Sequence, residues 1–306
     1  MSVAVQSATS RRGWWSNRDL RGWSFVAPFL AVFALVFLAP IGYAIYLSLY
    51  REQAFFGGKT FVGIGNYVDV FSDGKFWEGA LRVLLFLAVQ VPIMLGLALA
   101  AALAIDSGRL RAPRAFRLVI FLPYAVPGVV AVLMWGYLYG TSFGLAADIN
   151  HLLGTTLQPL SSRWVLTSIV NIVTWEFVGY NMLIFYSSLK TVPTELYEAA
   201  SIDGAGAWRT VFSIKIPALR GAIVIATIFS IIGSFQLFNE PKLLKTIAPN
   251  VIDSGYTANL YAYSLAFTGQ QVNYAATVSF LLGLIIVVVS YTILITANRR
   301  NRRAAA

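Results

Sequence analysis

Residues 195–217 read ELYEAASIDGAGAWRTVFSIKIP, a helical pattern that carries too much charge to cross a membrane. Thr194 is expected to cap the first helix of this segment. Glycine adopts the left-handed conformation without strain, so Asp203-Gly204 predicts the end of that helix. A second short helix is expected to follow until Pro217 prevents its continuation. The segment is therefore predicted to form a helix, a tight turn and another helix.

The composition of the chain is that of a polytopic membrane protein. Of its 306 residues, 58% are hydrophobic and only 12% are charged, whereas charged residues approach a quarter in soluble domains. The chain has no cysteine, which excludes disulfides and thiolate metal sites, and we expect no metal site. The formal charge of +10 comes from short basic clusters that flank apolar runs. That placement indicates a membrane topology signal and not a nucleic-acid-binding surface.

Six apolar stretches are long enough to cross a bilayer, which needs about 20 helical residues. They are Trp23–Leu49, Gly79–Ala104, Phe116–Tyr139, Trp164–Ser187, Ala218–Asn239 and Asn273–Ala297. The predicted fold class is therefore all-α, a polytopic membrane protein with six transmembrane helices. Residues 23–297 would form the membrane domain, between an N-terminal segment at 1–22 and a basic tail at 298–306.

The distribution of lysine and arginine predicts the orientation of these spans. Four basic residues lie in the N-terminal segment, and four lie in each of 109–117, 190–220 and 299–303, which all fall on one side. The loops on the other side hold seven basic residues in total. Because cytoplasmic loops carry the excess of positive charge, both termini and the 190–217 loop are expected in the cytoplasm.

The 195–217 segment resembles the cytoplasmic EAA loop of binding-protein-dependent ABC importers. The residues that match the family pattern are Glu198-Ala199-Ala200, Gly204, Ile214 and Ile216-Pro217. They stand in register, with Ile216 in place of the usual leucine. The alternative reading of the same pattern is an ordinary surface helical hairpin between two spans.

Three further segments resemble permeases of the carbohydrate type, as in maltose and glycerol-phosphate importers. They are Val62–Tyr67, which contains Gly-x-x-Asn-Tyr, Gly144–Gly154, and Ser234–Asn239. Their order and spacing agree with the family over nearly the whole chain. Each segment is a weak signal by itself, and the resemblance depends on all of them together.

The resemblance implies a division of labour among several chains. A second permease, in a heterodimer, would complete the pathway through the membrane lipid, and two ATP-binding subunits would hold ATP and Mg. An external solute-binding protein would deliver a sugar or a sugar derivative. This chain itself would bind no cofactor and catalyse no reaction. A Gly-Lys-Thr sequence ending at Thr60 lacks the earlier glycine of a phosphate loop, so it does not predict a nucleotide site.

The resemblance also assigns the EAA loop to ATPase coupling, through a helix seated in a groove of the partner. The coupling residues would be Glu198, Ala199, Ala200, Asp203, Gly204, Trp208, Ile214 and Pro217. Glu198 and Asp203 could pair with basic groups of the partner, or Glu198 could cap the loop itself. Trp208 could anchor in the ATPase groove or pack against the helices of this chain.

Polar residues inside the fourth predicted span are candidates for the substrate path. Glu176 lies deep in an apolar stretch, where a lipid-facing charge is costly, so we expect it to face protein or water. Asn171 lies on a second polar face of the same helix, with Trp175 beside it. These faces could bind sugar hydroxyls, or they could hydrogen bond to neighbouring helices.

Near the outer end of the fifth predicted span, Gln236, Asn239 and Glu240 are candidates to contact the substrate or the docked binding protein.

Two other classes of membrane protein remain as alternatives. A proton-coupled secondary transporter could use Glu176 as its proton site. A purely structural membrane anchor would make no use of Glu198 or Gly204.

Overall fold

The computed structural model describes residues 17–53 and 58–305, with side chains described for 23–53 and 58–296. The N-terminal half contains α1 (Asn17–Phe33), η1 (Ala34–Leu38), α2 (Ala39–Ser48), β1 (Tyr50–Glu52), β2 (Lys59–Phe61), α3 (Gly65–Phe71), α4 (Gly74–Asp106), α5 (Pro113–Phe121), η2 (Leu122–Ala125), α6 (Gly128–Leu138) and α7 (Leu145–Leu153). The C-terminal half contains α8 (Val165–Leu189), α9 (Thr194–Ile202), α10 (Ala207–Thr210), η3 (Val211–Lys215), α11 (Ile216–Ala218), α12 (Arg220–Phe235), α13 (Asn239–Ile247), α14 (Ala258–Phe267) and α15 (Val272–Ala305).

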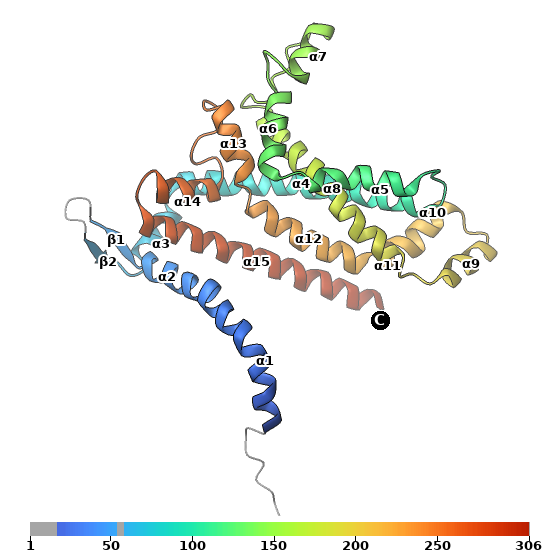
Figure 1. Ribbon diagram of the computed structural model, residues 1–306, viewed down its shortest axis with the longest axis horizontal. Helices are drawn as coiled ribbons and strands as arrows, with labels where there is room; N and C mark the ends of the chain where they lie inside the picture. The colour runs from blue at the N-terminus through green and yellow to red at the C-terminus, as the bar shows by residue number, and fades with distance from the viewer. Residues whose placement is uncertain (1–16, 54–57, 306) are drawn as a thin grey trace, which may run out of the picture.

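The long helices α4, α8, α12 and α15 run along a common direction and form the body of the molecule (Figure 1). The helices α9, α10 and α11 lie at one end of this body, whereas α14 and the β1–β2 hairpin lie at the other. The first helix, α1, extends away from the bundle, and α6 and α7 project from its side. The predicted all-α class is confirmed, with the short β1–β2 hairpin as the one addition within the described chain.

Among the described residues, four helical segments are long and apolar enough to cross a membrane, and two bent pairs bring the number to six if each counts as one span. The predicted third span, Phe116–Tyr139, is one of the bent pairs, with an angle of 96° between Pro113–Ala125 and Gly128–Leu138. Pro127 disfavours the helical conformation at Val126, whose ψ is 129°, so the helix breaks there. The predicted boundaries are therefore corrected to two shorter helices at this position.

The predicted fifth span, Ala218–Asn239, also needs correction, because α12 ends at Phe235 and Asn239 begins α13. The backbone carbonyl groups just after α12 accept hydrogen bonds from side chains at the start of α14. The Thr257 hydroxyl donates to the Leu237 carbonyl at 3.1 Å, and the Asn259 amide donates to the Gln236 carbonyl at 3.4 Å. A helix can end at this depth because another part of the protein satisfies its backbone.

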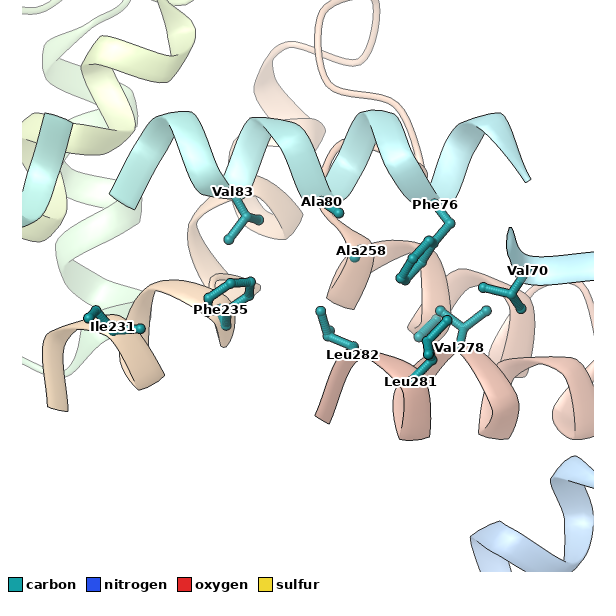
Figure 2. Packing of buried hydrophobic residues seen from close by; sticks show 11 residues of the cluster. Val70, Phe76, Ala80, Val83, Ile231, Phe235, Ala258, Val278, Leu281 and Leu282 are labelled. Atoms are coloured by element: carbon teal, nitrogen blue, oxygen red, sulfur yellow. The ribbon is translucent and has the colours of Figure 1, made fainter. Parts of the chain in front are cut away.

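One apolar cluster joins α3, α4, α12, α14 and α15 (Figure 2). Phe76 and Val278 are fully buried at its centre, and Phe235 of α12 is 2% exposed. Gly79 of α4 allows the backbone of α14 to approach closely, because a Cβ there would lie 2.8 Å from the backbone nitrogen of Ala258. The cluster therefore fixes α14 against α4 at the end of the bundle that carries the hairpin.

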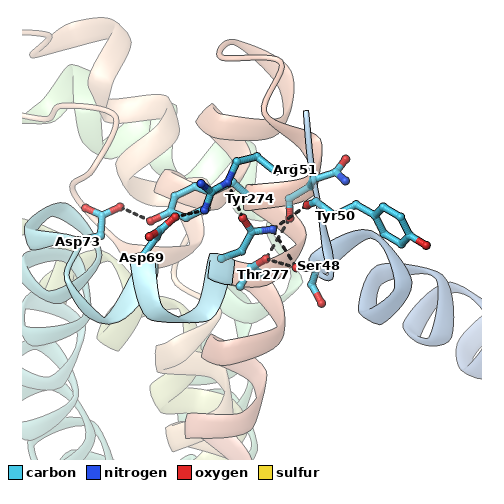
Figure 3. Close-up of polar contacts among 9 residues, drawn as sticks. Ser48, Tyr50, Arg51, Asp69, Asp73, Tyr274 and Thr277 are labelled. Atoms are coloured by element: carbon cyan, nitrogen blue, oxygen red, sulfur yellow. Dashed lines mark hydrogen bonds and ion pairs between the residues drawn. The ribbon is translucent and has the colours of Figure 1, made fainter. Parts of the chain in front are cut away.

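A polar network holds the hairpin and α3 against α15 at the same end (Figure 3). The buried Asn66 amide donates to the carbonyls of Ser48 at 2.9 Å and Tyr50 at 2.7 Å. Arg51 donates to Asn66 and forms an ion pair with Asp69. Asn66 belongs to the Gly-x-x-Asn-Tyr motif, and its role in this structure is to satisfy the backbone between α2 and the hairpin.

Candidate functional site

The segment 190–217, called the EAA-like loop from here on, forms the predicted helix, turn and helix. Gly204 has a φ of 69°, which confirms the left-handed turn expected at this glycine. The amide of Ala205 donates to the Ala200 carbonyl at 2.9 Å, and the amide of Gly204 donates to the Ser201 carbonyl at 3.1 Å. This pattern satisfies the last carbonyls of α9, as glycine-terminated helices commonly do.

Two local predictions for the EAA-like loop were wrong by a few residues. The residue that caps α9 is Pro193, and Thr194 is the first residue of the helix. Pro217 does not end the second helix, which continues to Ala218 through the π-helical turn η3. A proline is tolerated at the first positions of a helical segment, where its missing N–H is not needed. The chain bends by 62° between this helix and α12.

Most residues of the EAA-like loop are exposed to solvent. None of the residues of α9, all of them described, is buried, and Glu198 and Ala199 are exposed. Trp208 is 77% exposed and stacks on Phe212 with ring centroids 6.2 Å apart. Its indole therefore contacts a neighbour in its own helix and leaves a broad aromatic face open. Ala200, Ile214 and Pro217 are half-buried, whereas Asp203 and Gly204 are exposed.

No ion pair involves Glu198 or Asp203 within the described chain. In this part of the described chain, no side-chain hydrogen bond makes Glu198 a cap of the loop. Both carboxylates are exposed, as are the rings of Trp208 and Phe212.

A cavity of about 350 Å³, called the central pocket from here on, lies between α4, α8, α12 and the start of α13. Its lining includes Gln236, Asn239 and Glu240, so the structure brings these three predicted residues together. α4 contributes Gln90 and α8 contributes Asn181. Amides can both donate to and accept from hydroxyl groups, and a carboxylate can accept from them. The apolar remainder of the lining can cover carbon atoms.

Aromatic rings from η2 and α8 contribute to the lining of the central pocket. Tyr124 of η2 stacks on Tyr180 of α8 with ring centroids 4.9 Å apart. Both tyrosines also line a second, more open groove of about 680 Å³, which contains Arg117 and Lys190. The two hollows therefore share the tyrosine pair in their linings, with Glu240 lining the first and Lys190 the second.

Glu176 lies beside the central pocket but not in its lining. Its side chain faces protein, as expected, since the residue is only 8% exposed. A Cβ on Gly128 would lie 3.2 Å from its Oε1 atom, so the carboxyl group fills the space beneath the start of α6. Glycine at 128 makes room for this acid at the broken span.

The structure places Asn171 and Trp175 away from the central pocket. The Asn171 amide donates to the Tyr139 hydroxyl at 2.7 Å. Asn171 and Tyr139 both line a separate hollow of about 430 Å³. Trp175 packs edge-on against Trp135 with ring centroids 5.7 Å apart. These two residues thus join α8 to α6, and they do not share a cavity with Gln236.

Sequence reasoning missed several residues of the central pocket. Gln90 is a lone amide in the apolar helix α4, which was a signal of the same kind as Glu176. It is 2% exposed and donates to the Met94 sulfur at 3.1 Å. Tyr124 and Phe177 gave no such signal, because aromatic residues are common in any membrane span.

Comparisons with known proteins agree with this architecture. The family model described as "Binding-protein-dependent transport system inner membrane component" matches residues 61–303. The lactose transport system permease protein LacF of Rhizobium radiobacter is 34% identical over 96% of this chain and 100% of its own length. The trehalose transport system permease protein SugA of Mycobacterium tuberculosis is 30% identical over 92% of this chain and 89% of its own length.

Among solved structures, a bacterial ABC transporter involved in the import of the acidic polysaccharide alginate contains a chain of the same fold, with a TM-score of 0.78 and 19% identity. The match covers 94% of this chain and 96% of that chain. The family match confirms the prediction that this chain is an importer permease. The chain belongs to the family of binding-protein-dependent transport system inner membrane components.

Proposed function

We propose that this chain is one of two permease subunits of an ATP-driven importer of small neutral sugars. The observation that carries the proposal is the central pocket, whose lining combines the amide side chains of Gln90, Gln236 and Asn239 with the rings of Phe177 and Tyr180. Amide groups bind sugar hydroxyls, and aromatic rings cover the apolar face of a sugar. The two relatives described above are named for lactose and trehalose, which are both neutral disaccharides.

The charge of the central pocket favours a neutral sugar over an acidic one. Glu240 is the only charged side chain in its described lining, and Glu176 lies buried nearby. A carboxylated saccharide would meet negative charge on this side of the pathway, and like charges at close range repel. The proposed cargo thus differs from that of the alginate transporter, although the fold is the same.

In the proposed mechanism the EAA-like loop couples the pathway to ATP hydrolysis. Its exposed residues include two aromatic rings, Trp208 and Phe212, and two carboxylates, Glu198 and Asp203, which would supply the aromatic anchor and the charged rim of a helix that docks in a groove. A second permease subunit, two ATPase subunits that hold ATP and Mg, and an external solute-binding protein would complete the assembly. The chain would cross the inner membrane with both termini and the loop in the cytoplasm.

ATP binding would close the ATPases and move the EAA-like loops of both permeases together, which opens the pathway to the loaded binding protein. Hydrolysis would then return it to the inward-open state. Such a cycle works only because ATP and substrate each bind the two states unequally. The alternative of a proton-coupled transporter using Glu176 leaves the shape of the loop unexplained, and membership of this family disfavours it.

The test is purification of the tagged chain in mild detergent, followed by uptake measurements with radiolabelled lactose and trehalose. We expect an ATPase, a second permease and a solute-binding protein to co-purify, and uptake to depend on ATP. Gln236→Ala should reduce uptake, whereas Gln271→Ala, a matched change at an exposed site outside the pocket, should not. Uptake that an uncoupler abolishes while ATP is maintained, by a chain that purifies alone, would refute the proposal.

A further inference from the structure

Three charged side chains from separate segments meet at the end of the bundle that carries the EAA-like loop. Asp106 is the last residue of α4, Lys190 follows the end of α8, and Lys215 lies in η3. One carboxylate oxygen of Asp106 accepts from Lys190 Nζ at 2.8 Å, and the other accepts from Lys215 Nζ at 2.6 Å. These three residues are called the Asp106 cluster.

The Asp106 cluster is mostly removed from water. The side chains of Asp106 and Lys215 are 8% and 12% exposed, whereas that of Lys190 is 56% exposed. The pair between Asp106 and Lys215 is therefore a desolvated one, and removing one partner would leave a buried charge without its counter-ion. The geometry of this pair is consequently held more firmly than that of a surface ion pair.

Aromatic rings on α9 and α8 extend the Asp106 cluster. The ammonium group of Lys215 lies 5.4 Å from the centre of the Tyr197 ring, which belongs to α9. Lys190 lies 5.1 Å from the centre of the Tyr186 ring on α8. Cations at this distance from an aromatic face are attracted to it. Burial raises the pKa of the Tyr197 hydroxyl, so the ring stays neutral beside these charges.

The remaining contacts of the EAA-like loop with the bundle are sparse. The helices α9, α10 and α11 and the turn η3, all described, contain no buried residue. The Asp106 cluster therefore supplies a desolvated link between the loop and α4, which lies more than 80 residues earlier in the chain. Both α4 and α8 contribute walls to the central pocket, through residues such as Gln90 and Asn181.

We propose that Asp106 is a positioning residue for energy coupling, which ties the EAA-like loop to α4 and α8 so that movement of the loop reaches the walls of the central pocket. The inference rests on the proposed function. Asp106 acts through Lys215 on the side of the loop and through Lys190 on the side of α8. Replacing the carboxylate by an amide keeps the shape of the side chain but removes the charge that both lysines share.

The test measures how accessible the central pocket is to a thiol reagent, so the identity of the cargo need not be known. Because the chain has no cysteine, Ser230→Cys places a single reporter thiol of this chain in the lining of the pocket. The assembled transporter with its partner subunits is reconstituted in inside-out vesicles, and a membrane-impermeant maleimide is added outside. Labelling is measured without nucleotide and after trapping with ATP and vanadate, and ATP hydrolysis is measured in parallel.

In the reporter chain, trapping should slow labelling at least about fivefold, the lower end of typical coupling between sites. Asp106→Asn should remove most of this protection per ATP hydrolysed, and Asp106→Glu, which keeps the charge, should restore it. Lys215→Met should act like Asp106→Asn, since it breaks the link on the side of the loop. If Asp106→Asn prevents assembly, Lys215→Met and Asp106→Glu decide the question.

Equal protection in the reporter chain and in both Asp106→Asn and Lys215→Met would overturn the inference. A merely structural role predicts that result, because it would lower the yield of complex and leave the response of each assembled complex unchanged. Failure of ATP and vanadate to change labelling in the reporter chain itself would overturn the proposed function and this inference with it. The two failures are therefore distinguished by the behaviour of the chain that retains Asp106.

Discussion

The crossing of α5 over α8 provides a sharp test of the structure at Gly179. A Cβ built on this glycine would overlap the carbonyl oxygen of Ile120 and lie 2.6 Å from the Cα atom of Phe121. These are backbone atoms, so no change of rotamer can relieve the overlap. In Gly179→Ala the two helices must separate until the shortest contacts reach about 3.4 Å, the lower limit of ordinary van der Waals contact.

Separating the helices by this amount should destabilise the protein by about 1–3 kcal/mol, the usual range for an overpacked site. The same movement carries Tyr124, which follows α5 directly, away from Tyr180 in the stacked pair. Because both rings line the central pocket, we expect Gly179→Ala to reduce uptake as well as stability.

The assay is thermal unfolding of the purified transporter, followed by tryptophan fluorescence, together with uptake. In domains of 150–250 residues, 1 kcal/mol corresponds to about 2–4 °C in Tm, so we expect a decrease of at least about 2 °C. Gly96→Ala in α4 is the matched control, because its new Cβ meets nothing within 4 Å. A Tm for Gly179→Ala as high as that of Gly96→Ala would refute the close crossing of α5 and α8.

Three other predictions concern the EAA-like loop. Gly204→Ala places an alanine at a φ of 69°, which costs about 1–2 kcal/mol, so ATP-dependent uptake should fall, while Gly206→Ala, at a φ of −67° and with open space around it, should be neutral. Trp208→Ala should leave Tm unchanged, because the ring is 77% exposed, and should lower the amount of ATPase recovered in pull-downs; a lower Tm with full recovery would contradict this. The hydrogen bond to Asp106 raises the pKa of Lys190. Its contribution to folding stability is therefore complete below about pH 10.4, the ordinary pKa of lysine, and is lost only as the pH rises through the raised pKa. The stability deficit of Asp106→Asn should accordingly be the same at pH 6 and pH 9 in thermal unfolding, and a deficit that disappears within this range would contradict the assignment.

The features that could be predicted from the sequence are those encoded within one helix length. Apolar runs locate the spans to within a few residues, and Gly204 locates the turn of the EAA-like loop through its conformational freedom. Pro123 and Pro127 show that the third span is irregular, but they do not give the angle of 96°, which depends on the packing of α5 against α8 and of α6 against α13.

The part of the site that escaped prediction depends on contacts between distant segments. α8 has polar residues on two faces, and its sequence does not say which face meets α12 and which meets α6. Asn171 and Asn181 were expected on one polar face, but Asn171 bonds to Tyr139 beside α6, whereas Asn181 lines the central pocket. The Asp106 cluster could not be predicted either, because Lys190 and Lys215 follow Asp106 by 84 and 109 residues and each lies in a basic segment that membrane topology already explains.

The geometry of α8 gives a physical route from the EAA-like loop to the central pocket. The helix is regular from Val165 to Leu189 and contains no proline, so it can move as a rigid rod. Ten residues separate Lys190 from Tyr180, which corresponds to about 15 Å along a helix. In the proposed mechanism, a displacement of the loop that pulls on Asp106 and Lys190 would therefore also move the tyrosine pair, which lines both the central pocket and the groove beside Arg117. The stacked rings are therefore the place where such a displacement would first change access to the pocket.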